Sequence, residues 1–457
     1  MGFSCSVPII SRIMKKLKAV LAASLVSLSC FQLFSFDLTE AAAGMAGAFE
    51  GLVDDNEGLT SFRSLNIPSG GRIESLGGAG TALGDDISFF DYNPAASAIL
   101  ESSEAAMFHN AWIGDSAMET IAATGRRGQL GYGGQLRCFY VPFSEYNFFG
   151  DKVASSYYSE TSATANISYN FKAGYRFKGI AVGGNLRGAW RNVPDYTDNQ
   201  TDKIIDGSGL AQSGLGIMVD AGVIVRLNVF KRFASREPNL RLGAALNNVG
   251  VSLTGFGKSV KLDDPLPTRL SLGAAYRIIK PILVTLDIKK PLNILDIPSS
   301  EKFSVSLGGE FTVADFCKID AGFCLQGGSP RISLGSTFSL KRIELGINYT
   351  FDLTSSANPV NHISCSVKAL LPGKAKIRQN LQKKIDDNYI KGLKLYAQGE
   401  YEEAIACWDL VIEAAMHKQM AVTFEPAIEA KASAERFLAS KQRITDMNKL
   451  NATPRQK

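Results

Sequence analysis

Three carboxylates lie close together in one glycine-rich, apolar stretch of the chain, residues 78–100. Asp85 and Asp86 are adjacent, Asp91 follows, and an Asn-Pro-Ala tripeptide comes at 93–95. Residues of these types suit three different roles. Paired carboxylates can exchange protons in general acid–base catalysis, and a glycine-rich loop can bind phosphate through its backbone amides. A compact segment with few bulky side chains can instead fill the inside of a larger structure.

The first two roles do not agree with the rest of the pattern. A phosphate-binding loop of the common kind ends in Gly-Lys-Ser/Thr, and "GGAGTALGDD" contains no such sequence. Adjacent acids in a glycine-rich stretch usually form turns, so Asp85 and Asp86 are not predicted to be catalytic. No nucleophile, base and orienting group form a recognisable set elsewhere, and His109, His362 and His417 are expected to be structural or surface residues. The sequence therefore predicts a protein that is not an enzyme and needs no cofactor.

Cysteine and charge patterns exclude further classes of site. The cysteines are residues 5, 30, 138, 317, 324, 365 and 407. They form no CxxC pair and have no histidine at zinc spacing, so neither a metal site nor a disulfide framework is predicted. The net charge of +5 comes without a basic patch interleaved with aromatic residues, which argues against nucleic acid as a partner.

The N-terminus carries a pattern typical of export. Basic residues at 12–18 precede an apolar run that ends near Phe36, which predicts a secretory signal peptide over residues 1–36. A membrane anchor is the alternative, but the run is short for a spanning helix. Cleavage near Phe36 and lipidation of Cys30 are both open, and Met14 is an alternative start.

Residues 104–370 alternate between apolar and polar side chains, as β-strands with two different faces do. The alternating segments include 166–177, 179–190, 215–227 and 342–351. Many of them last about ten residues, the length that a tilted strand needs to cross a bilayer. About fourteen such segments fit into the region, an even number, which predicts an all-β transmembrane barrel of antiparallel strands. A soluble periplasmic β-sandwich alternates in the same way and is the alternative.

The connections between these segments alternate in length. Short ones are expected near 125–127, 177, 278–280, 313–315 and 341, with a longer one at 228–238, and long ones at 142–161, 191–212, 250–266, 290–301 and 352–359. A short gap at 326–329 breaks the rule. This alternation is typical of short periplasmic turns and long outer loops. Both ends of the barrel would then lie in the periplasm.

Residues 77–95 carry a resemblance to a known family. "GGAGTAL", then "DD.S...YNPA" ending in Asn93-Pro94-Ala95, resembles the N-terminal hatch of the FadL/TodX family of outer-membrane hydrocarbon transporters. "LRLGAALNNVG" at 240–250 looks like a mid-barrel strand of that family. The resemblance covers about residues 40–370 and is nearest to an uncharacterised spirochaete branch.

The resemblance implies a fourteen-stranded barrel at 104–370 that is plugged by a hatch at 37–103. Its implied partners are long-chain fatty acids or other small apolar molecules, taken up passively and released sideways into outer-membrane lipid through a kinked strand. The ligand would lie against the hatch, beside the site residues Phe89, Phe90, Asn93, Pro94 and Ala95. The alternative function is a barrel that transports nothing and acts as a scaffold for another protein. An apolar pocket beside Asn93-Pro94 would favour transport, and a filled one would favour the scaffold.

A lateral gate is expected at three glycines of "GYGGQLR", residues 131–137. Gly131, Gly133 and Gly134 could mark a kink or bulge in the third strand. A merely flexible strand is the alternative.

The composition changes near residue 371. All but three of the 43 glycines precede this point, and residues 371–457 are rich in charge, which predicts a helical domain. Within it, 389–415 looks like one tetratricopeptide repeat. A single repeat cannot bury its own faces, so it needs capping helices, the barrel or a partner. The functional prediction is a periplasmic protein that docks through Tyr401 and Trp408. The alternative is a small bundle that packs only on itself.

Overall fold

The computed structural model describes residues 54–452, with gaps at 147–148, 174–176, 197, 199–202, 206–207, 234–236, 257–259, 261–264, 328, 341, 354–360, 372–374 and 417–424. The signal peptide predicted over 1–36, with Met14 and Cys30, lies outside the described residues. So do residues 37–53 of the predicted hatch, and His417.

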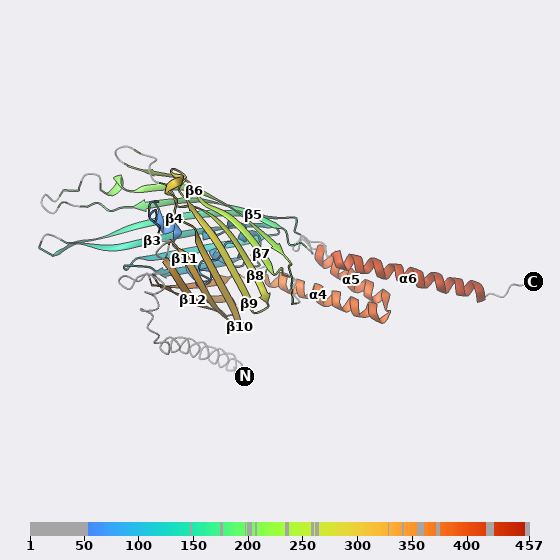
Figure 1. The fold of residues 1–457 in the computed structure, drawn as a ribbon. Helices are drawn as coiled ribbons and strands as arrows, with labels where there is room; N and C mark the ends of the chain where they lie inside the picture. The colour runs from blue at the N-terminus through green and yellow to red at the C-terminus, as the bar shows by residue number, and fades with distance from the viewer. Residues whose placement is uncertain are drawn as a thin grey trace, which may run out of the picture.

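Fourteen antiparallel strands form a closed barrel, in which each strand pairs with its neighbours in sequence and β14 pairs with β1 (Figure 1). The strands are β1 (Glu104–Ala111), β2 (Ala117–Arg127), β3 (Leu130–Tyr146), β4 (Lys152–Phe171), β5 (Ile180–Asn192), β6 (Gly214–Leu227), β7 (Leu240–Thr254), β8 (Thr268–Ile279), β9 (Ile282–Leu292), β10 (Ser304–Ala314), β11 (Cys317–Gln326), β12 (Ser329–Leu340), β13 (Ile343–Asp352) and β14 (His362–Leu370). The predicted barrel and its strand number are confirmed. The sandwich is wrong, because a single closed sheet has no second sheet to pack against.

The predicted alternation of short and long connections is present, with two corrections. The segment 166–177 is not one strand, because β4 ends at Phe171 and Lys172 turns the chain with a φ of 50°. The long loop expected at 142–161 is mostly strand, because β3 and β4 continue as a paired ribbon to Tyr146 and Lys152.

Apolar side chains predominate on the outward face of the strands and polar ones on the inward face, where a few apolar residues such as Phe108 and Ile224 pack against the hatch. On β14, for example, Ser364 and Lys368 are buried in the lumen, whereas Ile363 and Val367 face outward and are 48% and 49% exposed. The exposed outward side chains include Met107, Ile121, Leu136, Ile167, Leu186, Ile217, Leu272, Leu286, Leu307, Ile319, Ile347 and Val367. Closure of the sheet leaves no unpaired strand edge, so such an exterior can face hydrocarbon.

Residues 54–103 run lengthwise through the barrel and form the hatch, the blue segment inside the wall in Figure 1. At the end with the long loops, the backbone N–H of Ser61 donates to the carbonyl of Pro265, 2.9 Å away. At the end with the short turns, Arg126 donates to the carbonyl of Leu100, 3.3 Å away. Between these ends the hatch has only short helical turns, which are η2 (Arg63–Asn66), α3 (Arg72–Ser75), η3 (Ile87–Asp91) and η4 (Pro94–Ala98).

Three helices follow the barrel and lie beyond the end that carries the short turns (Figure 1). They are α4 (Ala375–Gln398), α5 (Tyr401–Met416) and α6 (Glu425–Ala452). Gly399, with a φ of 84°, ends α4 and lets the chain reverse into α5. None of the helices in the described part of the chain is long and apolar enough to cross a membrane.

Candidate functional site

Asn93 fixes the hatch to the barrel wall. Its side-chain oxygen accepts from the N–H of Ala95 at 3.1 Å and caps η4, while Pro94 takes the first helical position, where no N–H is needed. Its amide nitrogen donates to the carbonyl of Thr81 at 2.8 Å and to the barrel carbonyls of Val223 and Ala244 at 3.1 and 3.3 Å. One side chain therefore joins two parts of the hatch to β6 and β7.

Glycines in the wall allow the hatch backbone to come this close. A Cβ atom at Gly222 would lie less than 3.0 Å from the side-chain oxygen of Asn93, and one at Gly183 would lie as close to the carbonyl of Pro94. The other wall glycines that meet the hatch in this way are Gly131, Gly133, Gly243, Gly273, Gly308, Gly322 and Gly335. The sequence analysis missed this pattern. Its signal is a glycine at an inward-facing position in many of the strands.

The bulge expected at the third strand is wrong. Pairing runs without a register shift through Gly131, Gly133 and Gly134 to both β2 and β4. Gly131 and Gly133 face inward, against Ser97 and Phe90 of the hatch, and close packing accounts for them. The lateral gate stays a prediction without this structural basis.

The acids of the opening stretch pair with basic residues, as expected for side chains in a polar lumen. Asp85 lies 2.9 Å from Arg72 of the hatch and 2.9 Å from Arg241 of β7. Asp86 pairs with Lys368 of β14 and also caps η3 by accepting from the N–H of Ser88 at 2.9 Å. Burial alone would raise the pKa of Asp85, but Arg241 and Arg72 hold it well below its usual range. An ionised, paired carboxylate of this kind is not a general acid.

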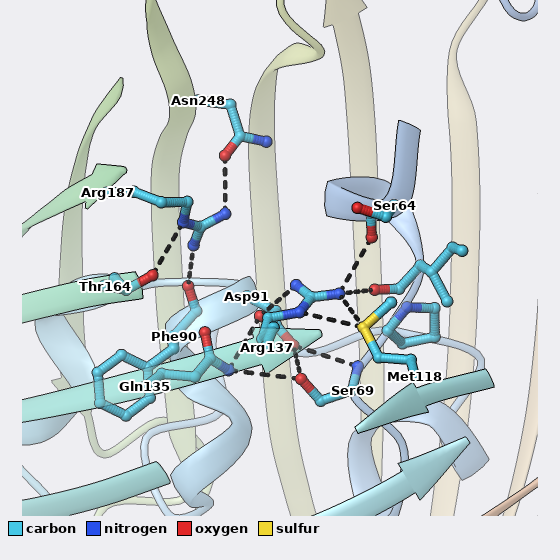
Figure 2. A network of polar contacts seen from close by, with 12 residues as sticks. Ser64, Ser69, Phe90, Asp91, Met118, Gln135, Arg137, Thr164, Arg187 and Asn248 are labelled. Atoms are coloured by element: carbon cyan, nitrogen blue, oxygen red, sulfur yellow. Dashed lines mark hydrogen bonds and ion pairs between the residues drawn. The ribbon is translucent and has the colours of Figure 1, made fainter. Parts of the chain in front are cut away.

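Asp91 and Phe90 are the centre of a second polar network (Figure 2). The Arg137 guanidinium of β3 lies 2.8 Å from Asp91 and also donates to the carbonyl of Ser64 at 3.1 Å. Arg187 of β5 donates to the carbonyl of Phe90 at 3.0 Å and to the side chain of Asn248 at 2.9 Å. Both arginines thus hold hatch backbone to strands on one side of the wall.

Phe89 and Phe90 are fully buried in a packed cluster. Their rings stack with centroids 4.3 Å apart, and they pack with Ala95, Phe108 and Ile224 among others. The structure therefore brings the predicted site residues together. Two cavities among the described residues are lined by other parts of the hatch and wall and by neither Phe89 nor Phe90.

The larger cavity, of about 110 Å³, lies elsewhere, between the hatch and the wall near the long loops. Its charged and aromatic lining includes Asp91, Tyr92, Trp112, Arg269, Lys289 and His362. Sequence reasoning missed Arg269 and Lys289. Both stand at inward positions in their strands, and that position was the available signal.

The helical region buries one of its two predicted docking residues. Trp408 is 1% exposed and packs in a core with Ile385, Val411 and Ala427. It therefore holds the three helices together and cannot present its ring to a partner, which corrects its predicted role. Tyr401 is half-buried and stacks against Phe437, with ring centroids 6.0 Å apart.

Within the described ranges, no group of three or more His, Cys, Asp or Glu side chains is arranged to hold a metal ion. The cysteines described there are free thiols. His109 and His362 lie in β1 and β14. His362 also has a defined structural role, because its Nε2 lies 2.8 Å from Glu74 of the hatch.

Among solved structures, the chain is similar to the "CymD monoaromatic hydrocarbon channel", with a TM-score of 0.45 and 14% identity over 67% of this chain and 99% of that one. It is also similar to a Pseudomonas aeruginosa FadL homologue, with a TM-score of 0.40 and 11% identity over 66% and 98%. The strand order of the barrel comes from the hydrogen-bonded strand pairings of this chain.

Sequence relatives give a firmer assignment. A UPF0164 protein of Treponema pallidum (strain Nichols) is 31% identical over 419 residues, which cover 90% of each chain. A second UPF0164 protein of the same organism is 28% identical over 415 residues, covering 85% of this chain and 78% of that one. The model of the uncharacterised protein family UPF0164 matches residues 38–374. The chain therefore belongs to the uncharacterised protein family UPF0164.

Proposed function

We propose that the protein is an outer-membrane channel for the passive uptake of small hydrophobic molecules, with its helical region in the periplasm. The observation that carries the proposal is the hatch, which fills the lumen from the long-loop end to the short-turn end and leaves a cavity beside it. A ligand that enters between the long loops would meet this cavity first. The apolar exterior of the closed barrel supports a membrane location.

Gating is proposed to involve only part of the hatch. The segment 93–97 is held by Asn93, by Ser97 and by close backbone packing, so its displacement would leave several buried polar groups without partners. Residues 65–68 of the segment 65–69 line the cavity, and the segment is held to the wall through Asn110 of β1 and through Gln135 and Arg137 of β3. We therefore assign the moving part to 65–69 and the fixed part to 93–97.

The resemblance of residues 77–95 to the FadL/TodX hatch agrees with a ligand that is small and hydrophobic. Long-chain fatty acids remain in the proposal only if the hatch moves, because a cavity of about 110 Å³ is far smaller than the pockets of drug-sized ligands, roughly 300–1,000 Å³.

A second candidate is a scaffold that transports nothing, and one observation favours it. The space beside Asn93-Pro94, where an apolar pocket would favour transport, is filled by Phe89, Phe90 and their neighbours. Under this alternative the long loops or the three helices would hold another protein, while the barrel would serve as an anchor.

Uptake into proteoliposomes separates the two functions. Full-length protein without its native cysteines would be reconstituted, and entry of N-phenyl-1-naphthylamine would be followed by fluorescence. Uptake no faster than in empty vesicles contradicts the channel and leaves the scaffold.

Two engineered disulfides then test the gating. The pair Ser69→Cys and Gln135→Cys joins the proposed moving part to β3, where the two native side chains lie 3.4 Å apart. The pair Ser97→Cys and Ser168→Cys joins the fixed part to β4, where the hydroxyls lie 2.5 Å apart. Oxidation should stop uptake in the first pair only, and reduction should restore it. Equal inhibition by both disulfides would refute the division of the hatch.

A further inference from the structure

The larger cavity holds more positive than negative charge. Three cationic side chains line it, Arg269 of β8, Lys289 of β9 and Arg331 of β12, together with two acids of the hatch, Glu74 and Asp91. Charges that are removed from water need partners nearby, so each group can be checked for the one it has.

The two acids are already satisfied by other groups. Asp91 accepts from Arg137 at 2.8 Å and from the hydroxyl of Ser69 at 2.5 Å. Glu74 accepts from Ser364, from His362 at 2.8 Å and from Asn110 at 3.2 Å. Neither acid needs a cation of the cavity.

Among the described residues, two of the cations form no direct ion pair with an acid. Within the described chain, Lys289 donates only to the carbonyl of Gly78, at 2.6 Å, and its ammonium lies 5.3 Å from the ring centre of Tyr92. The carboxylate of Asp287 on the same strand attracts Lys289 by its charge, but the two form no direct ion pair, and its Oδ2 accepts from Thr81. Arg269 donates to the backbone carbonyl of Asp91, and its Nε is buried without a hydrogen-bond partner. The third cation, Arg331, has Asp352 at 3.7 Å.

The remaining lining is part polar and part apolar, and the space is small. Its polar side chains are Asn66, Ser304, Gln326, Ser333, Thr350 and His362. Leu65, Ile67 and Pro68 of the hatch face the cavity, as do Trp112 and Pro291 of the wall. Its volume of about 110 Å³ is somewhat less than that of an engineered protein cavity of about 150 Å³ that binds benzene. A ligand with one small apolar body and one anionic group matches both the size and the unpaired charge.

We propose that this cavity binds a small organic anion, a carboxylate about the size of benzoate or smaller, with Lys289 and Arg269 as the groups that hold the anionic end. The inference rests on the proposed function, because it names the class of substrate that such a channel would take. It distinguishes this substrate from a neutral hydrocarbon, which would leave both cations unpaired, and from a long-chain acid, which would not fit.

Calorimetry with benzoate tests the site on the full-length protein in detergent. Benzamide is the matched neutral probe, since it keeps the shape and lacks the charge. Lys289→Met and Arg269→Gln each remove one charge-assisted hydrogen bond and should weaken benzoate binding by on the order of ten-fold or more. Lys290→Met is the control, because Lys290 is the next residue of β9 but donates to the carbonyl of Glu301 and does not line the cavity.

The outcomes separate this inference from the channel function. Benzoate binding that the two cavity variants weaken and the control does not, with weaker or absent benzamide binding, supports the site. Equal binding of benzoate and benzamide overturns it. Benzoate binding that survives when Lys289→Met and Arg269→Gln are combined in one protein also overturns it. Toluene uptake by proteoliposomes of the same preparation reports on the channel separately. A protein that admits toluene but does not bind benzoate keeps the function and loses the site, and the reverse result keeps the site and loses the function.

Discussion

Two parts of the hatch differ in what lies beside them. Residues 87–100 lie against wall glycines and bury Phe89 and Phe90 in a packed cluster. Residues 65–78 also meet wall glycines, at Ser75, Leu76 and Gly77, but residues 65–68 line the cavity. A single plug can therefore combine a fixed anchor with a segment that has room to move. It gives four predictions, which run from the largest expected effect to the smallest.

The largest effect is expected from breaking the ion pair of Asp86, which caps η3 at the start of the anchored part. Lys368→Met removes the cation that pairs with Asp86 and also contacts Glu344 at 3.1 Å. Loss of one partner of a buried pair costs about 3–5 kcal/mol, because the other charge stays buried. Unfolding in urea, followed by heat-modifiable migration, measures this change. Adding Asp86→Asn should recover part of the loss, and a double variant as unstable as the single one would contradict the pairing.

A smaller loss is expected where the hatch meets the wall glycines. Gly222→Ala places a methyl group against the side chain of Asn93, and overpacking of this kind costs about 1–3 kcal/mol. Gly188→Ala in the neighbouring strand is the matched control, because its added methyl would have open space. The same unfolding assay compares them. Equal stability of the two variants would show that the hatch shifts to make room for the added methyl group.

Asn93→Ala tests the anchor from the side of the hatch. It removes the cap of η4, which contributes about 1 kcal/mol, and leaves two barrel carbonyls without this donor. We expect a loss of about 1–2 kcal/mol together with faster naphthylamine uptake, since the anchor loosens. Unchanged uptake at lowered stability would mean that the anchor has no part in the barrier.

The smallest effect is expected in the wall of the cavity, at Gln326 of β11. Gln326→Ala shortens a side chain that lines the cavity, and such a change away from a packed core usually alters stability by less than about 0.5 kcal/mol. Thermal unfolding is sufficient to measure it. A loss comparable with that of Asn93→Ala would remove the distinction between the two parts.

The sequence predicted the barrel well because the period of two and the bilayer length act on each strand separately. The alternation of Ile363 and Val367 with Ser364 and Lys368 can be read without knowing any neighbour. The pairing of the hatch acids with basic residues in the lumen was also foreseeable, since charge has to be matched inside a barrel.

Features that depend on several distant segments could not be predicted. The strand end at Phe171 follows from the conformation of Lys172, which the alternating letters do not reveal. The cavity requires Tyr92, Trp112 and Arg269 to meet from three separate regions. In the sequence, Gly131 and Gly133 suggested a kink. The hatch residues that pack against them, Ser97 and Phe90, lie some 40 residues earlier in the chain, so the close packing could not be foreseen.

The order of the hatch and the strands along the chain also has a consequence for assembly. The hatch precedes every strand, yet the groups that hold Glu74 and Asp86 lie on β14, which is the last strand. These contacts span 288 and 282 residues, so they can form only after the whole barrel sequence has been made. Contacts between such distant segments form slowly, because the intervening chain must first be brought into order. The seam between β1 and β14 is therefore expected to close around a hatch that is already inside, which makes the plug a core on which the barrel is completed.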